Sequence, residues 1–128
     1  MSDGECEQQF HQDMIRGAER LKREIGDNAN RFMQMVGDLG GVGAARHLLQ
    51  GRDASDGFTT LWEHGRLEMS VEAHVLLPWY RELFTEKQLG TAERRLREHR
   101  FGIDAYLARA EREWPEWAVA QANKRDSP

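Results

Sequence analysis

The chain has 128 residues, of which 39% are apolar and 31% are charged, and its formal net charge is −4. A chain of this length can form one hydrophobic core without a structural metal or disulfides, so we expect a single domain. Cys6 is the only cysteine, which excludes an intramolecular disulfide. No run approaches the ~20 apolar residues that span a bilayer, and the start of the chain lacks the pattern of a secretion signal. We therefore expect a cytoplasmic protein that does not enter a membrane.

Helical periodicity accounts for nearly all of the sequence, because apolar residues recur every three or four positions. No stretch alternates apolar and polar residues over the length of a strand. In chain order, the predicted helices cover 5–25, 28–39, 42–50, 58–64, 71–84 with a break at Pro78, 86–99, and 103–113. The spacing thus predicts an all-α fold, arranged as a compact irregular array of about six to seven mostly short helices.

The predicted helix ends carry residues that suit them. Either Asp27 or Asn28 can cap the second helix, and Ser70 can cap the segment that starts at residue 71. The stretch Thr85–Gln88 has the form of a capping box, in which each of the two end residues bonds the backbone of the other. Gly65 suits the left-handed position that ends the helix over 58–64. Either Ser55 or Asp56 can cap the start of that helix.

The strongest apolar patterns predict which large side chains are buried. The inward face of the second helix should consist of Phe32, Met35, Val36 and Leu39. Trp62 and Trp79 lie in similarly apolar surroundings and are expected in the core. On that basis, Trp62→Ala is expected to lower the free energy of unfolding by about 3–5 kcal/mol.

Several short stretches together resemble a type of small uncharacterised bacterial all-helical protein. They are Arg31–Val36, Gly40–Val42 with Ala45 and Leu48–Leu49, Asp56–Thr59 with Leu61–Glu63 and Gly65–Leu67, Ser70–Ala73, and Leu83–Thr85. The resemblance covers about residues 10–101 and transfers no activity or cofactor to these positions. It implies a self-contained module and a bacterial defence context. We expect one helical domain over 1–113, followed by a tail over 114–128 that either docks or is disordered.

The glycine-rich corner around Gly40 and Gly41 admits several interpretations. A phosphate-binding loop would follow a strand and would show the spacing G-x-G-x-x-G, and neither condition is met. A helix-turn-helix has the right segment lengths, and its DNA-facing residues would be Arg46, His47, Gln50 and Arg52. Asp38 and Asp53 flank that segment with the wrong charge for phosphates. A helical hairpin within the core is therefore favoured.

Histidines and carboxylates gather in one part of the sequence, where His64 and His74 lie near Glu63, Glu68 and Glu72. These residue types can bind a metal or exchange protons if the fold brings them together. Their spacing matches neither His-Glu-x-x-His nor Glu-x-x-His, which are the signatures of metalloproteases and di-iron bundles. We assign no catalytic residue, metal or cofactor, and a small enzyme with a His/Glu site is the second alternative for function.

The densest basic group consists of Arg94, Arg95, Arg97 and Arg100, and it is a candidate contact for phosphate or for an acidic protein. The alternative is a solvated helix face that Glu93 and Glu98 partly neutralise. Trp114 and Trp117 flank Pro115 in a polar tail, which is typical of a docking segment. Those two side chains can equally fold back onto the core of the chain itself.

These observations predict a non-catalytic helical module that binds a protein partner or a second copy of itself. The alternative function is nucleic-acid binding through the basic helix face or the glycine corner. The candidate contact residues for a partner or a nucleic acid are Arg46, Arg94, Arg95, Arg97, Arg100, Trp114 and Trp117.

Overall fold

The computed structural model describes the backbone of residues 2–126 and the side chains of residues 4–123. Its elements are α1 (Ser2–Ile25), α2 (Asn30–Gln50), α3 (Asp56–Glu63), the single turn η1 (Leu67–Met69), α4 (Val71–Val75), the single turn η2 (Arg81–Leu83), α5 (Glu86–Glu98), α6 (Ile103–Arg112) and α7 (Glu116–Asp126). The described part contains no strand, so the predicted all-α fold is confirmed.

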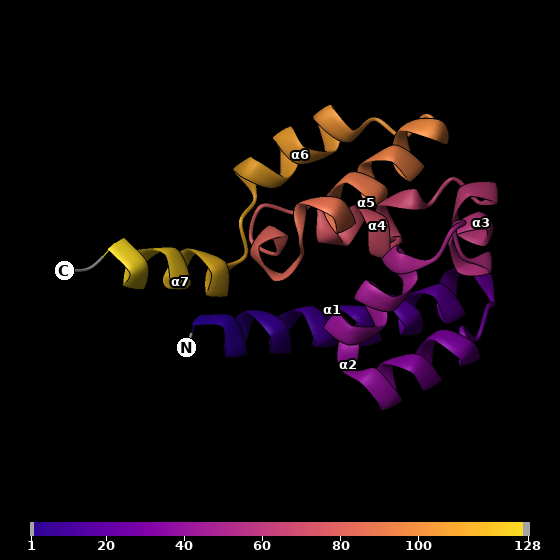
Figure 1. Ribbon diagram of the computed structural model, residues 1–128, viewed down its shortest axis with the longest axis horizontal. Coiled ribbons are helices and arrows are strands. Elements are labelled where there is room, and N and C mark those ends of the chain that lie inside the picture. The colour runs from indigo at the N-terminus through magenta and orange to yellow at the C-terminus, as the bar shows by residue number, and fades with distance from the viewer. Residues whose placement is uncertain (1, 127–128) are drawn as a thin grey trace.

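The helices form an irregular array rather than a bundle of parallel rods (Figure 1). The long helix α1 packs against α2, and the short helix α4 packs against α5. α6 lies over α5 on the outer side, and α7 extends beside the first turns of α1 (Figure 1). None of the helices in the described part is long and apolar enough to cross a membrane.

Most of the helix starts follow the predicted caps. Ser55 and Ser70 each accept a hydrogen bond at their hydroxyl from the amide three residues later, at 3.2 and 3.1 Å. Thr85 and Gln88 form the expected capping box at the start of α5. The prediction for α2 was wrong, because the residue before it is Ala29 in a left-handed conformation, without a side-chain cap. Asp27 instead accepts from the amide of Ala29 at 2.9 Å.

A kink in α2 replaces the predicted break at the two glycines. Gly40 has φ 79° and ψ 165°, which separates two helical segments within α2. The next residue, Gly41, is buried where α1 crosses α2, and its amide donates to Nδ1 of His11 at 2.8 Å. A Cβ atom at residue 41 would lie 2.5 Å from the Cα atom of His11, so only glycine allows the two helices to approach this closely.

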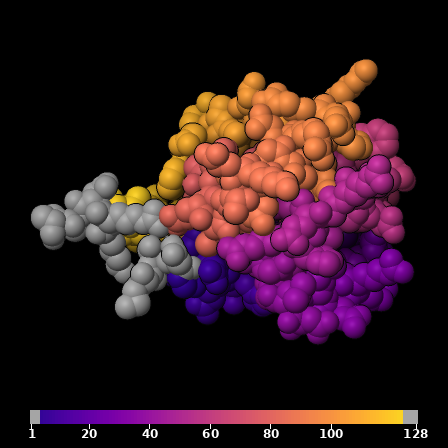
Figure 2. Space-filling model, viewed as in Figure 1, coloured from indigo at the N-terminus to yellow at the C-terminus, as the bar shows by residue number. Residues whose placement is uncertain are grey.

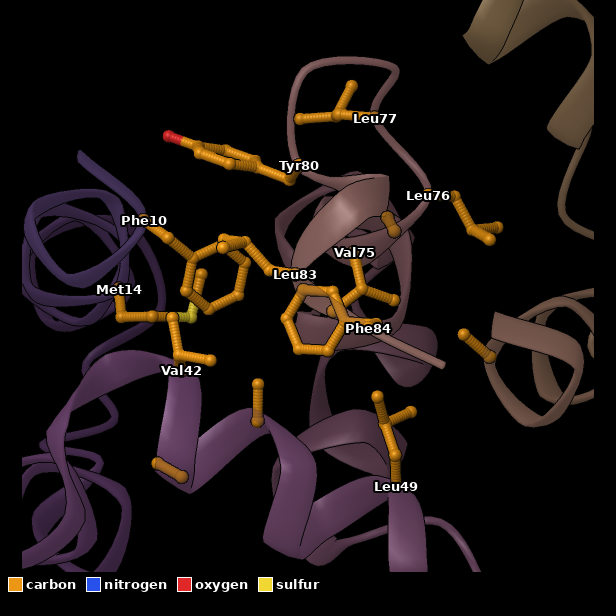
Figure 3. Packing of buried hydrophobic residues seen from close by; sticks show 14 of the residues in the cluster. Phe10, Met14, Val42, Leu49, Val75, Leu76, Leu77, Tyr80, Leu83 and Phe84 are labelled. Atoms are coloured by element: carbon orange, nitrogen blue, oxygen red, sulfur yellow. The ribbon is translucent and has the colours of Figure 1, made fainter. Parts of the chain in front are cut away.

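The core lies between α1, the second half of α2 and the segment from α4 to η2 (Figure 3). At its centre, the ring of Phe10 packs edge-on against Tyr80 at 5.0 Å and against Phe84 at 5.4 Å. Phe10 and Tyr80 are both fully buried. These aromatic contacts join the first helix of the chain to a segment about seventy residues later.

Two of the predicted core residues are exposed. Leu39 has 52% of its surface exposed and Trp62 has 48%. In the short helix α3, Phe58 and Leu61 occupy the buried face, and Trp62 lies at its edge with its ring 5.1 Å from that of His99. The large destabilisation expected from Trp62→Ala assumed full burial, so that expectation is corrected.

Candidate functional site

The clearest candidate site is an apolar pocket of about 610 Å³. Side chains from α1, the start of α2, α3 and the segment 69–74 line it, and its apolar residues are Met14, Ala18, Leu21, Ala29, Phe32, Met35, Leu48, Ala54, Phe58, Leu61, Met69 and Val71. Figure 2 shows a recess between the purple start of α2 and the magenta segment ahead of α3, with the indigo α1 behind it. The volume falls within the range of natural ligand pockets.

Methionines are prominent in this lining, since Met14, Met35 and Met69 reach it from three different elements. Methionine side chains are unbranched and polarisable, so they adapt to apolar groups of different shapes. Met14 is buried, whereas Met35 and Met69 are partly exposed. The pocket therefore has an adaptable apolar wall that solvent or an occupant can reach.

Charged groups at the pocket are mostly acidic. Asp13, Asp27, Asp56 and Glu72 line it together with a single guanidinium, that of Arg31. Asp13 accepts from the hydroxyl of Tyr80 at 2.5 Å and pairs with Arg16 at 2.8 Å. Burial, followed by this hydrogen bond to Asp13, raises the pKa of Tyr80, so its phenol stays protonated as a donor.

Arg95 is the one candidate contact that the fold buries, with 3% of its side chain exposed. It pairs with the equally buried Glu72 at 3.0 Å, and it donates to the backbone carbonyls of Leu48, Gly51 and Asp53 at 2.7 to 3.1 Å. The guanidinium thus ties α5 to α4 and to the loop before α3. We withdraw Arg95 from the candidate contacts, because an internal cation cannot meet a partner at the surface.

Glu72 lines the pocket and is buried, with 2% of the residue exposed. Burial raises the pKa of Glu72, and the hydrogen bond and charge of Arg95 oppose that rise. An unpaired carboxylate at this depth would be costly, so Arg95 stabilises one wall of the pocket as well as the loop.

The other arginines of the basic group lie on the surface, where acids accompany two of them. Arg97 pairs with Glu93 at 2.8 Å, and Arg94 lies 3.7 Å from Glu98. Those are the pairs expected for a solvated, partly neutralised helix face. Arg100 is exposed just after α5 in a left-handed conformation.

Arg46, the candidate from the glycine corner, is exposed and donates to the backbone carbonyl of Leu83 at 2.7 Å. In the same segment of α2, Val42, Ala45 and Leu49 are buried in the core. His47 is exposed on the same segment. The corner is therefore a packed helical kink, and Arg46 links α2 to η2.

Trp114 and Trp117 lie against the body of the protein. The ring of Trp114 is 5.5 Å from that of Trp79, and the ring of Trp117 is 5.7 Å from that of Tyr80. The following helix, α7, buries Ala118. The two tryptophans thus fold back onto the chain, which is the second of the two interpretations of this segment.

The histidines and carboxylates near residue 68 do not converge on a metal site. Nδ1 of His64 and Nδ1 of His74 each lie 2.9 Å from the backbone carbonyl oxygen four residues earlier. Since a carbonyl oxygen can only accept, each imidazole ring is the donor. Glu68 pairs with Arg66, and Glu72 pairs with Arg95. Across the described residues, no group of three or more His, Cys, Asp or Glu side chains is placed to hold a metal ion.

The pocket was not anticipated from the sequence, although a signal for Arg95 was present. Arg95 follows the buried Ala92 by three positions and precedes the buried Leu96, so helical spacing places it on the inner face of α5. For the pocket, Phe32 and Met35 were expected to face inward, but their spacing does not reveal that the opposing helices leave space.

The fold and the pocket together define a small all-helical protein with a wide apolar recess. No family model, no curated protein and no solved structure matches the chain.

Proposed function

We propose that this protein is a non-catalytic binding module that holds an apolar segment of a protein partner in the pocket between α1, α2 and α3. The observation that carries the proposal is the pocket itself, at about 610 Å³ with a predominantly apolar lining. Apolar surface that stays open to solvent on a small protein is typical of an interaction site. A methionine-rich wall favours a flexible peptide segment, because it can repack around different side chains.

The surface arginines favour this proposal over nucleic-acid binding. Arg94 and Arg97 have acids beside them, and the formal net charge of the chain is −4. A polyanion would gain little from cations that are already paired, and its affinity would fall steeply with salt. The proposal therefore places partner binding at the pocket instead of the α5 face.

Met35→Asn tests the proposal, because it puts a polar, uncharged side chain into the apolar wall. Gln34→Asn is the matched control, since Gln34 is exposed on the same helix and lies outside the lining. We expect a partner captured from the native cell by the wild-type chain to be retained by Gln34→Asn and lost by Met35→Asn. Mass spectrometry of the captured material, with and without nuclease, measures this.

Two outcomes would contradict the proposal. Retention of the same partner by folded Met35→Asn protein would place binding away from the pocket. Loss of all captured material after nuclease would instead favour nucleic-acid binding. Far-UV circular dichroism of both variants checks that the helices are intact.

A further inference from the structure

We infer that the segment held in the pocket is an amphipathic helix with Lys or Arg at one end of its apolar face. This inference rests on the proposed function and adds the shape and charge of the occupant. Two features of the pocket carry it, namely the length of its wall along α1 and the distribution of charge around it.

The length of the wall suits a helix. On α1, the lining runs from Asp13 to Leu21, which corresponds to about 12 Å of helix axis at 1.5 Å per residue. The apolar anchors of a helix bound in a groove recur at i, i+3, i+4 and i+7, and they span roughly 10 Å. Two turns of a partner helix therefore match the wall that α1 offers.

The charge of the lining favours a cationic partner. Two of its four acids have basic partners, since Asp13 pairs with Arg16 and Glu72 pairs with Arg95. Neither Asp27 nor Asp56 forms an ion pair with another described residue.

These two acids lie at one end of the molecule, where the loop after α1 and the start of α3 come together (Figure 1). Arg31 is the only Lys or Arg in the described lining that offsets them, and His74 is the one histidine there. Cations at the corresponding end of the partner helix would meet this excess of carboxylates, and acids there would be repelled.

Three synthetic peptides of equal length separate shape from charge. The first has Leu at i, i+3, i+4 and i+7 with Lys at one end, and the second replaces each Lys by Glu. The third has the composition of the first, but its Leu residues are spread around the helix. Binding of each fluorescently labelled peptide to the full chain is followed by anisotropy, at low salt and at ~150 mM salt.

We expect the Lys peptide to bind about tenfold more tightly than the Glu peptide at low salt, with a smaller ratio at ~150 mM salt. The dispersed peptide should bind weakly, and Met35→Asn should weaken the Lys peptide far more than Gln34→Asn does. Asp56→Asn should weaken the Lys peptide by roughly threefold, and Arg31→Gln should strengthen it by a similar factor. Asp38→Asn is the matched control, because Asp38 is an exposed acid of α2 outside the lining.

The outcomes separate this inference from the proposed function. Equal binding of the Lys and Glu peptides, both tighter than the dispersed one, would overturn the inference about charge and leave the pocket as the binding site. Tighter binding of the Glu peptide would overturn it as well. If neither helical peptide binds better than the dispersed one, the inference about a helix is wrong, whereas the proposed function requires only an apolar segment. If peptide binding survives Met35→Asn, binding lies outside the pocket and the proposed function fails as well.

Discussion

Replacing Arg95 by Met is expected to lower the free energy of unfolding by about 3–5 kcal/mol. The substitution keeps much of the apolar volume but removes the cation that pairs with Glu72 at 3.0 Å. A carboxyl with 2% exposure would then lack its counter-ion. Three backbone carbonyls in and beside the loop before α3 would also lose their donor. Urea denaturation of the wild-type and variant chains measures the difference.

Two controls distinguish the buried pair from a general charge effect. Arg97→Met removes an arginine of the same helix whose partner is the exposed Glu93, and it should change stability little. The effect of Arg95→Met should also depend on pH, because burial raises the pKa of Glu72 and loss of Arg95 raises it further.

A group whose pKa is raised by folding stabilises the folded state when the pH is below its unfolded-state pKa. This stabilisation is lost as the pH rises through its folded-state pKa. The penalty of Arg95→Met should therefore be smaller near about pH 5 than near about pH 8. A penalty similar to that of Arg97→Met, unchanged with pH, would mean that Arg95 is solvated.

Replacing Gly41 by Ala is expected to lower the free energy of unfolding by about 3 kcal/mol. The new methyl group would lie 2.5 Å from the Cα atom of His11, which is backbone and cannot rotate away. α1 and α2 would have to separate, and the 2.8 Å hydrogen bond from the Gly41 amide to His11 would lengthen. Thermal unfolding followed by circular dichroism measures the effect.

Gly37→Ala is the matched control for Gly41→Ala. Gly37 also belongs to α2, but a Cβ atom added there would have no atom within 4 Å. The better helix propensity of Ala should stabilise this variant by up to about 1 kcal/mol. Equal stability changes in the two variants would contradict the close approach of α1 and α2.

Local signals in the sequence were sufficient for most of the fold. The capping residues Ser55, Ser70 and Thr85 were predicted correctly because each satisfies backbone amides within its own turn. Gly40 was also correctly placed as an interruption, because a left-handed φ is inexpensive for glycine. These features depend on neighbouring residues only.

The errors concern contacts between distant segments. Trp62 and Leu39 have the hydrophobicity of core residues, but about half of each remains exposed. Arg95 is the same residue type as the exposed arginines near it on α5. Its side chain is buried, and it pairs there with the buried Glu72. Helical periodicity identifies the inner face of a helix, but it does not show whether the facing helices close completely over Phe32 and Met35.

The NMR signals of the methionine methyl groups provide the most direct test of whether the partner binds in the pocket. In a two-dimensional spectrum of the ¹³C-methyl-labelled chain, addition of a captured partner should shift the signals of Met14, Met35 and Met69, which line the pocket. The signal of Met33 should stay in place, because this residue belongs to the same helix as Met35 but lies outside the lining. Unchanged signals for the three lining methionines at saturating partner would contradict binding in the pocket.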